Sequence, residues 1–466
     1  MFSSERRFRQ SWLVCAALLA SYAGSAAVVQ YGSLVLPLVA LAGILAFLNV
    51  NLWRWLMVAV ILLPVSTEIP LSGQRLTGSV EITDFCVIVM WGLWLAKKLV
   101  RRERLFPRDP VASLWGFVVL AAVVSFTNGA AFYLRSTVLR DVILHAVKWI
   151  SYSVLYFLVL DEVDGRRDIW ILVHLLIAAS SVAAGIALYQ QYAGIGSYMS
   201  YYGGLRTSGV FGSVNGFGVF LASVLLLLLV LLSRAHLSAK RTIVYLAAVI
   251  VLFGGIVSTY SRAAWLTLAV GSLLVGASSL LGGRDSTTQR RIWPLFLMIS
   301  LIVFALYAFP PVVRRVEETF RPQVWSSNPY VDLGRREKAW RQYFLEFSRR
   351  PLVGTGYFSY VYLGTVHRSG SHSQWLTMLV DMGLIGVIPF LGIMWQFVRR
   401  GLSVARHQVG ELKAFGSGFL VILGGIGLAT QSGEFLYGGR LMGMVWLLAG
   451  LVTVAGNLPK ELAPPR

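Results

Sequence analysis

The sequence predicts an all-α, polytopic integral membrane protein. Its 466 residues are 56% hydrophobic and 13% charged, whereas soluble domains are about 25% charged. The mean hydropathy is +0.69. Apolar runs long enough to cross the roughly 30 Å hydrocarbon core of a bilayer recur along the whole chain. Together these observations exclude an ordinary soluble domain.

We expect about fourteen transmembrane helices, with a range of 12–14 because the ends of predicted helices are uncertain by a few residues. The predicted spans are 11–30, 32–48, 52–65, 82–99, 111–127, 142–160, 169–192, 211–232, 243–259, 263–281, 292–309, 375–398, 415–430 and 441–455. A polar and basic stretch at 310–374 separates the last three from the rest. We expect this stretch to be one large loop that contains short helices.

The distribution of basic residues predicts the orientation, because cytoplasmic connections carry an excess of Lys and Arg. Clusters fall in the alternate connections at 97–108, 166–167, 240–241, 290–291 and 399–400. This arrangement predicts cytoplasmic N- and C-termini and places the 310–374 loop on the external, periplasmic side. The rule also accounts for part of the net charge of +20, so we expect no nucleic-acid partner.

The external loop is more basic than the topology rule requires. Its basic residues are Arg314, Arg315, Arg321, Arg335, Arg336, Lys338, Arg341, Arg349, Arg350 and Arg368. Leu333, Trp340, Phe344 and Phe347 recur at roughly helical spacing and predict a helix that Pro351 ends. Two interpretations stay open. The helix could lie on the outer leaflet with its cations toward lipid phosphates, or some arginines could face a cavity that holds a phosphorylated lipid.

Two arginines lie in short connections at the same external side. Arg206 begins the glycine-rich segment 206–216, and a lone arginine at a helix end is most often an interfacial anchor. Arg262 lies in the connection 260–265, which is so short that its charge must sit at or just inside the membrane surface. A charge at membrane depth is costly and is a functional hypothesis by default. For Arg262 the sequence slightly favours function over anchoring.

A third polar face lies on the span predicted at 142–160. Arg140, Leu144 and Lys148 follow one another at a spacing of four, with Asp141 and His145 beside them. Two interpretations are equally favoured. Lys148 could pair with a carboxylate between helices, or Arg140 and Lys148 could line a cavity and contact a substrate.

Metal chemistry is not indicated. The two cysteines, Cys15 and Cys86, both fall inside predicted spans, so neither a disulfide framework nor a thiolate metal site is expected. No DxD-like pair of carboxylates occurs near the external ends of the spans. We expect no metal and no cofactor.

Five motifs in this order resemble the O-antigen ligase and O-antigen polymerase family. They are Arg-x-Ser-Gly-x-Phe-Gly-x-x-Asn-Gly at 206–216, Tyr-Ser-Arg-Ala-Ala-Trp-Leu at 260–266, Gly-Arg-x-x-x-Trp in loose form at 334–340, Pro-Leu-Val-Gly-Thr-Gly at 351–356, and His-Ser-Gln-Trp-Leu with Gly-Leu-Ile-Gly at 372–386. No single motif is specific, but their order, spacing and topological side all match. The sequence departs from the family at Ser373, where many relatives have Asn, and in having more spans than the usual twelve or so.

The resemblance implies a division of the chain into N-terminal transmembrane helices at 1–168, a ligase/polymerase-like core at 169–402 that includes the 310–374 loop, and C-terminal transmembrane helices at 403–466. It implies an inverting, metal-independent glycosyltransferase of the bacterial inner membrane with a periplasmic active site. The donor would be a glycan on undecaprenyl pyrophosphate. The acceptor would be a lipid A–core sugar, as in a ligase, or the end of a second lipid-linked glycan, as in a polymerase.

Carried over by position, Arg206 and Arg262 would bind the pyrophosphate, with Arg335 as a further phosphate contact. His372 would be the general base on the acceptor hydroxyl, for which histidine has a suitable pKa. The alternative for His372 is a helix-capping or headgroup-level residue. For the whole protein, a flippase or transporter of lipid-linked oligosaccharides stays open, and so does an assembly protein without chemistry. Transporters tend to show repeated halves, and this sequence shows none.

Overall fold

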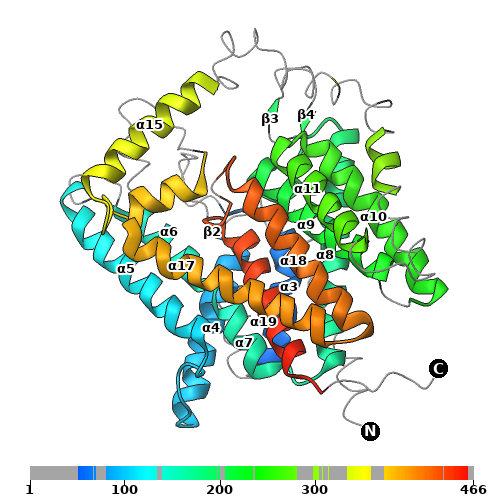
Figure 1. Ribbon diagram of the computed structural model, residues 1–466, viewed down its shortest axis with the longest axis horizontal. Helices are drawn as coiled ribbons and strands as arrows, with labels where there is room; N and C mark the ends of the chain where they lie inside the picture. The colour runs from blue at the N-terminus through cyan, green and yellow to red at the C-terminus, as the bar shows by residue number, and fades with distance from the viewer. Residues whose placement is uncertain are drawn as a thin grey trace, which may run out of the picture.

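The computed structural model describes residues 51–66, 68–69, 80–133, 139–196, 198–199, 205–234, 237–280, 297–303, 307, 313, 333–357, 372–433 and 435–459. Within these residues, eight helices are long and apolar enough to cross a membrane. The chain is therefore a polytopic helical protein (Figure 1). The predicted spans 11–30 and 32–48 lie outside the described residues, and 292–309 lies largely outside them. The total of fourteen and the placement of the termini stay predictions.

The helices follow the predicted order. They are α3 (Leu52–Val65), α4 (Ile82–Val100), α5 (Pro110–Tyr133), α6 (Leu139–Ser151), α7 (Val154–Glu162), α8 (Arg166–Tyr192), α9 (Val214–Arg234), α10 (Ala239–Thr259), α11 (Arg262–Leu280), α15 (Leu333–Arg349), α17 (Gln374–His407), α18 (Gly410–Ala429) and α19 (Gly439–Asn457). The predicted amphipathic helix before Pro351 is α15, and it packs against α17.

Two local details were not predicted. The span predicted at 142–160 is present as one candidate span, Val142–Glu162, but a turn at Tyr152 and Ser153 divides it into α6 and α7. The fold is all-helical, as predicted, apart from two antiparallel ladders of two-residue strands in the connections. β1 (Glu68–Ile69) pairs with β2 (Val80–Glu81), and β3 (Tyr198–Met199) pairs with β4 (Leu205–Arg206). Elements this short carry no hydrophobic alternation, so the sequence pattern does not reveal them.

The centre of the fold is α9. Of its candidate span, Val214–Ser233, 94% is buried inside the protein, as expected for a helix that is apolar on all sides. It packs against α10, α11 and α18. Since β4 and the segment 206–213 lead directly into this helix, the Arg206 motif is attached to the most firmly packed element of the described structure.

The two ends of the helical bundle differ in chemistry. One end carries ion pairs that join the predicted cytoplasmic connections: Lys98–Asp161 at 2.8 Å, Arg400–Asp109 at 2.6 Å and Arg241–Glu411 at 3.0 Å. The opposite end gathers the N-terminal ends of α9, α11, α17 and α19 (Figure 1). Helix N-termini carry partial positive charge. This second end also holds Arg206, Arg262 and His372.

Helix α19 approaches the α6–α7 break closely because it carries glycine there. A Cβ added at Gly443 would lie 2.4 Å from a ring atom of Tyr152. We expect Gly443→Ala to lower the free energy of unfolding by about 1–3 kcal/mol through overpacking, measured as a lower melting temperature in detergent. Gly427→Ala is the matched control, since a Cβ there meets nothing within 4 Å. Equal melting temperatures for the two variants would contradict this packing argument.

Candidate active site

The Arg206 side chain is oriented by two hydrogen bonds that it donates to acceptors on different helices. Its Nε donates to the carbonyl oxygen of Thr259 at the end of α10, at 2.9 Å, and its Nη2 donates to Oδ1 of Asn215 in the first turn of α9, also at 2.9 Å. The side chain is half-buried. The guanidinium is therefore held between the end of one helix and the start of another, and it does not extend freely toward the membrane surface.

The segments that carry Arg206 and Arg262 form one unit. The backbone N–H of Thr207 donates to the Ser258 carbonyl at 3.1 Å, and its hydroxyl donates to Ser258 Oγ at 2.8 Å. A Cβ at Gly218 would lie 2.8 Å from the Cβ of Ala264, so only glycine allows α9 to approach the start of α11 this closely. The structure thus brings together two motifs that the sequence separates.

The turn before Arg262 is built to begin a helix. Tyr260 adopts a left-handed conformation with φ of 48° and closes α10. Ser261 Oγ accepts the N–H of Ala264 at 3.4 Å, and Arg262 is the first residue of α11. A cation here opposes the helix dipole, whereas an anion would be attracted by both the helix N-terminus and the guanidinium. Burial raises the pKa of the Tyr260 phenol, which therefore stays neutral.

His372 precedes α17 in a strained backbone conformation. Its φ of 52° is one of three positive values at non-glycine residues in the described part of the chain, with those of Arg102 and Tyr260. Such conformations are costly and concentrate at functional sites. The imidazole is half-buried, which leaves it reachable from outside the helical bundle.

The start of α17 is anchored by Gln374. The Gln374 N–H donates to the Thr430 carbonyl at 2.9 Å, and its fully buried side-chain oxygen accepts the N–H groups of Leu436 and Tyr437 at 2.9 and 3.2 Å. The connection between α18 and α19 therefore fixes the chain two residues after His372.

The motif at 351–356 is hydrogen-bonded to α17. This helix is interrupted at Gly383, and the Pro351–Tyr357 segment docks at the interruption. The N–H of Thr355 donates to the Val380 carbonyl at 2.7 Å, and the N–H of Ile385 donates to the Leu352 carbonyl at 3.1 Å. Asn128 of α5 adds a hydrogen bond to the Gly354 carbonyl at 2.8 Å. These contacts fix α17 on both sides of its interruption at Gly383.

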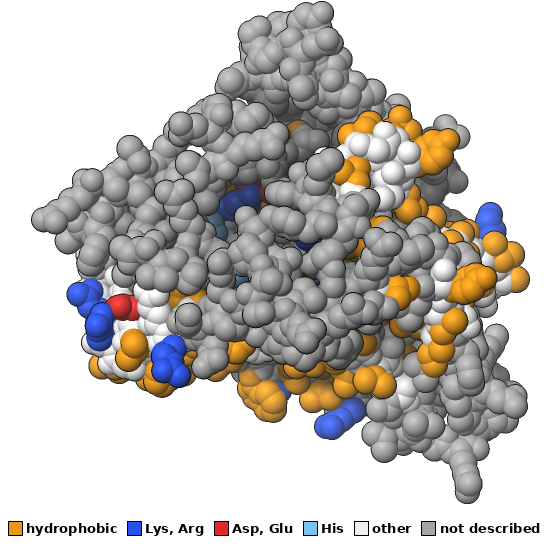
Figure 2. Space-filling model, turned by 90° about the horizontal axis from the view of Figure 1, so that it is seen from above, with side chains coloured by type: hydrophobic (Ala, Val, Ile, Leu, Met, Phe, Trp, Pro, Cys, Tyr) orange, Lys and Arg blue, Asp and Glu red, His pale blue; other side chains and the backbone are white. Residues whose placement is uncertain are grey.

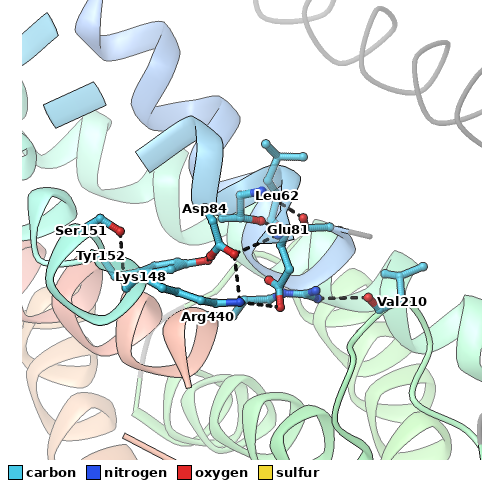
Figure 3. Close-up of polar contacts among 10 residues, drawn as sticks. Leu62, Glu81, Asp84, Lys148, Ser151, Tyr152, Val210 and Arg440 are labelled. Atoms are coloured by element: carbon cyan, nitrogen blue, oxygen red, sulfur yellow. Dashed lines mark hydrogen bonds and ion pairs between the residues drawn. The ribbon is translucent and has the colours of Figure 1, made fainter. Parts of the chain in front are cut away.

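A buried charge cluster, which the sequence did not predict as a unit, lies at the same end (Figure 3). It comprises Glu81, Asp84, Lys148, Tyr152 and Arg440. Lys148 Nζ lies 3.1 Å from Glu81 Oε1 and 2.9 Å from Asp84 Oδ2. This matches the first interpretation of Lys148, a lysine paired with carboxylates between helices. Burial acts to raise the pKa of Glu81, but the charges of Arg440 and Lys148 outweigh burial and hold that pKa below its usual value.

Glu81, Asp84 and Arg440 are functional candidates that sequence reasoning missed. Arg440 is 2% exposed and stands immediately before the predicted span 441–455. Their position inside or at the edge of an apolar run is the signal that could have drawn attention to them.

Two further candidates are placed only by their backbone. Arg335 lies in α15 and Arg140 in α6, and the side chains of both lie outside the described part of the structure. Viewed from this end of the molecule, acidic, basic and histidine side chains are visible below the outermost surface near the centre (Figure 2). Within the described residues, no group of three or more His, Cys, Asp or Glu side chains is placed to hold a metal ion.

A comparison with known families gives a match to part of the chain. A family model described as O-antigen ligase matches residues 246–391. The match contains Arg262, Arg335 and His372, and it begins after Arg206. It confirms the resemblance to this family for the motifs between residues 246 and 391, and it supports a membrane glycan-transfer function at family level. No curated protein matches the chain.

Proposed function

We propose that this O-antigen ligase-like protein transfers a glycan from undecaprenyl pyrophosphate to a sugar acceptor at the periplasmic face of the bacterial inner membrane. The acceptor is a lipid A–core sugar or the end of a second lipid-linked glycan. The observation that carries the proposal is the joining of Arg206 and the Arg262 helix start into one cationic unit at the same end as His372.

The proposed reaction is a single displacement with inversion. The acceptor oxygen forms a bond to the anomeric carbon of the donor while the bond from that carbon to the pyrophosphate oxygen breaks. His372 takes the acceptor hydroxyl proton as general base. The departing pyrophosphate gains negative charge, which Arg206, Arg262 and the N-terminus of α11 stabilise. The products are the glycosylated acceptor, undecaprenyl pyrophosphate and a protonated histidine, and no metal takes part.

Replacing Arg206 or Arg262 by glutamine tests the proposed leaving-group site. We expect each variant to lower transfer by about 10²–10³-fold, the loss typical of removing one preorganised donor from developing charge. The assay uses purified protein, lipid-linked glycan and acceptor, with a chelator and without nucleotide. Arg241→Gln, at the other end of the bundle, is the control and should transfer at the wild-type rate.

Two outcomes would contradict the proposal. Wild-type transfer rates in both Arg206→Gln and Arg262→Gln would remove the cationic site from the mechanism. Movement of the lipid-linked glycan across a vesicle membrane without any new glycosidic bond would assign the protein to transport, the alternative function that the helical architecture also fits.

A further inference from the structure

Arg440, at the start of α19, contacts the Arg206 motif directly. Its Nη1 donates to the carbonyl oxygen of Val210 at 3.2 Å, and its guanidinium carbon lies 4.4 Å from the centroid of the Phe211 ring. Its Nε donates to a carboxylate oxygen of Glu81 on the opposite side (Figure 3). One buried side chain therefore joins the N-terminal helices, the Arg206 motif and the last helix.

The charges in the cluster around Arg440 balance one another. Its cations, Arg440 and Lys148, are matched by two carboxylates, Glu81 and Asp84. The Tyr152 hydroxyl donates a further hydrogen bond to Asp84 Oδ1 at 2.8 Å. Glu81, Asp84 and Arg440 are 7%, 3% and 2% exposed. Because its charges compensate one another, the cluster is suited to fix the position of Arg440 and is poorly suited to attract an anionic substrate.

The Val210–Phe211 turn is held from several sides. The N–H of Phe211 closes the turn on the Ser208 carbonyl at 2.8 Å, and Gln190 of α8 donates to the Gly209 carbonyl at 2.8 Å. The Phe211 ring packs against Phe217 of α9, with centroids 5.5 Å apart. Arg440 contacts the turn from the α19 side. Since the turn follows Arg206 by only a few residues, its position constrains the strand β4 that carries Arg206.

We propose that Arg440 is a positioning residue for Arg206. It holds the Val210–Phe211 turn against Glu81, and so keeps the Arg206 guanidinium aligned for the donor pyrophosphate. This inference rests on the proposed role of Arg206. The planar fork of arginine is needed, because one flat group bonds a carboxylate and a carbonyl and stacks on an aromatic ring at once. A lysine could keep the charge beside Glu81 but not all three contacts.

A double-mutant cycle tests this inference. Arg440→Lys should lower kcat/KM for the lipid-linked donor about tenfold or more, since small displacements of a positioned group are costly, while KM for the acceptor stays the same. If Arg440 acts through Arg206, the same substitution in an Arg206→Gln background should change kcat/KM less than about twofold, because the two losses are not additive.

A matched control separates positioning from general destabilisation. Arg400→Lys removes a half-buried arginine, bonded to Asp109 and Thr453, at the other end of the bundle. It should lower the melting temperature in detergent without changing kcat/KM for the donor. If Arg440→Lys fails to fold, Phe211→Leu replaces it in the cycle. That variant removes the stacked ring and should give a several-fold loss that is again absent in the Arg206→Gln background.

The possible failures are distinguishable. An Arg440→Lys protein with wild-type donor kcat/KM, or one with the same fold loss in both backgrounds, would overturn the positioning role and leave the proposed function standing. An Arg206→Gln protein with full activity would refute the pyrophosphate role of Arg206, and the inference about Arg440 would fall with it.

Discussion

Replacing His372 by asparagine should lower the rate of glycan transfer by about 10²–10⁴-fold, the usual contribution of general acid–base catalysis. The acceptor hydroxyl must lose its proton as it attacks, and the asparagine amide cannot accept that proton. The binding of the lipid-linked donor should persist, because Arg206 lies on β4 and Arg262 on α11, and the Arg206 side chain keeps its hydrogen bonds to Thr259 and Asn215.

Asparagine is the informative substitution because of the backbone at this position. His372 has a φ of 52°, and asparagine is one of the non-glycine residues enriched in this left-handed region. The Asn variant therefore retains the turn into α17 and removes only the imidazole. His372→Ala confounds the loss of the base with backbone strain.

The measurement is the single-turnover rate of transfer with donor prebound, together with a separate binding assay for the donor. His407→Asn is the matched control, because His407 ends the same helix at the opposite end of the bundle. It should transfer at the wild-type rate. A His372→Asn protein that transfers within about threefold of the wild-type rate, on the scale set by acid–base catalysis, would exclude His372 as the base.

The sequence predicted the helical class and the positions of most described helices, because long apolar runs have few alternatives in a membrane. The interruption at Tyr152 was not predictable from the apolar run that continues through it. It depends on tertiary contacts, since the Tyr152 hydroxyl bonds Asp84 and its ring packs on the glycines of α19. Such contacts leave no local periodicity to detect.

Only part of the candidate site could be predicted, because some of its residues carry a local signal in the sequence and others are joined only by long-range contacts. Arg206 and Arg262 were identified because each is a charge at the edge of an apolar run, which is a local signal. The contact of Arg440 with Glu81 joins residues 359 positions apart, and a single sequence carries no information on such a pairing. The sequence marked Lys148 as an unusual charge but left a carboxylate partner and a substrate contact equally open, and the structure pairs it with Glu81 and Asp84.

The largest effect on stability should come from Gly383→Ala. Gly383 interrupts α17 with φ of 59° and ψ of −165°, a region that is essentially restricted to glycine and costs other residues about 1–3 kcal/mol. An added Cβ would also lie 2.3 Å from the carbonyl oxygen of Leu352, and overpacking costs about 1–3 kcal/mol more. We expect a loss of about 4 kcal/mol in the free energy of unfolding, within the combined range.

This loss should be accompanied by undocking of the Pro351–Tyr357 segment. The colliding carbonyl of Leu352 is itself the acceptor of the Ile385 N–H at 3.1 Å, so relief of the collision must break this hydrogen bond. Hydrogen exchange at Thr355 and Ile385 should therefore accelerate in the variant before the rest of α17 opens, and the melting temperature in detergent should fall. Gly116→Ala in α5 is the control, since a Cβ there meets nothing within 4 Å.

The Gly383→Ala variant also distinguishes a structural contribution to transfer activity from a catalytic one. The docked segment fixes α17 at the interruption, whereas His372 precedes the start of the helix. Undocking should therefore lower transfer in Gly383→Ala even though Arg206, Arg262 and His372 are all present. Gly383→Ala could instead have the melting temperature of the wild-type protein and keep slow hydrogen exchange at Thr355. In that case the docked segment would not be needed to hold the start of α17. The placement of His372 would then depend on the Gln374 anchor alone.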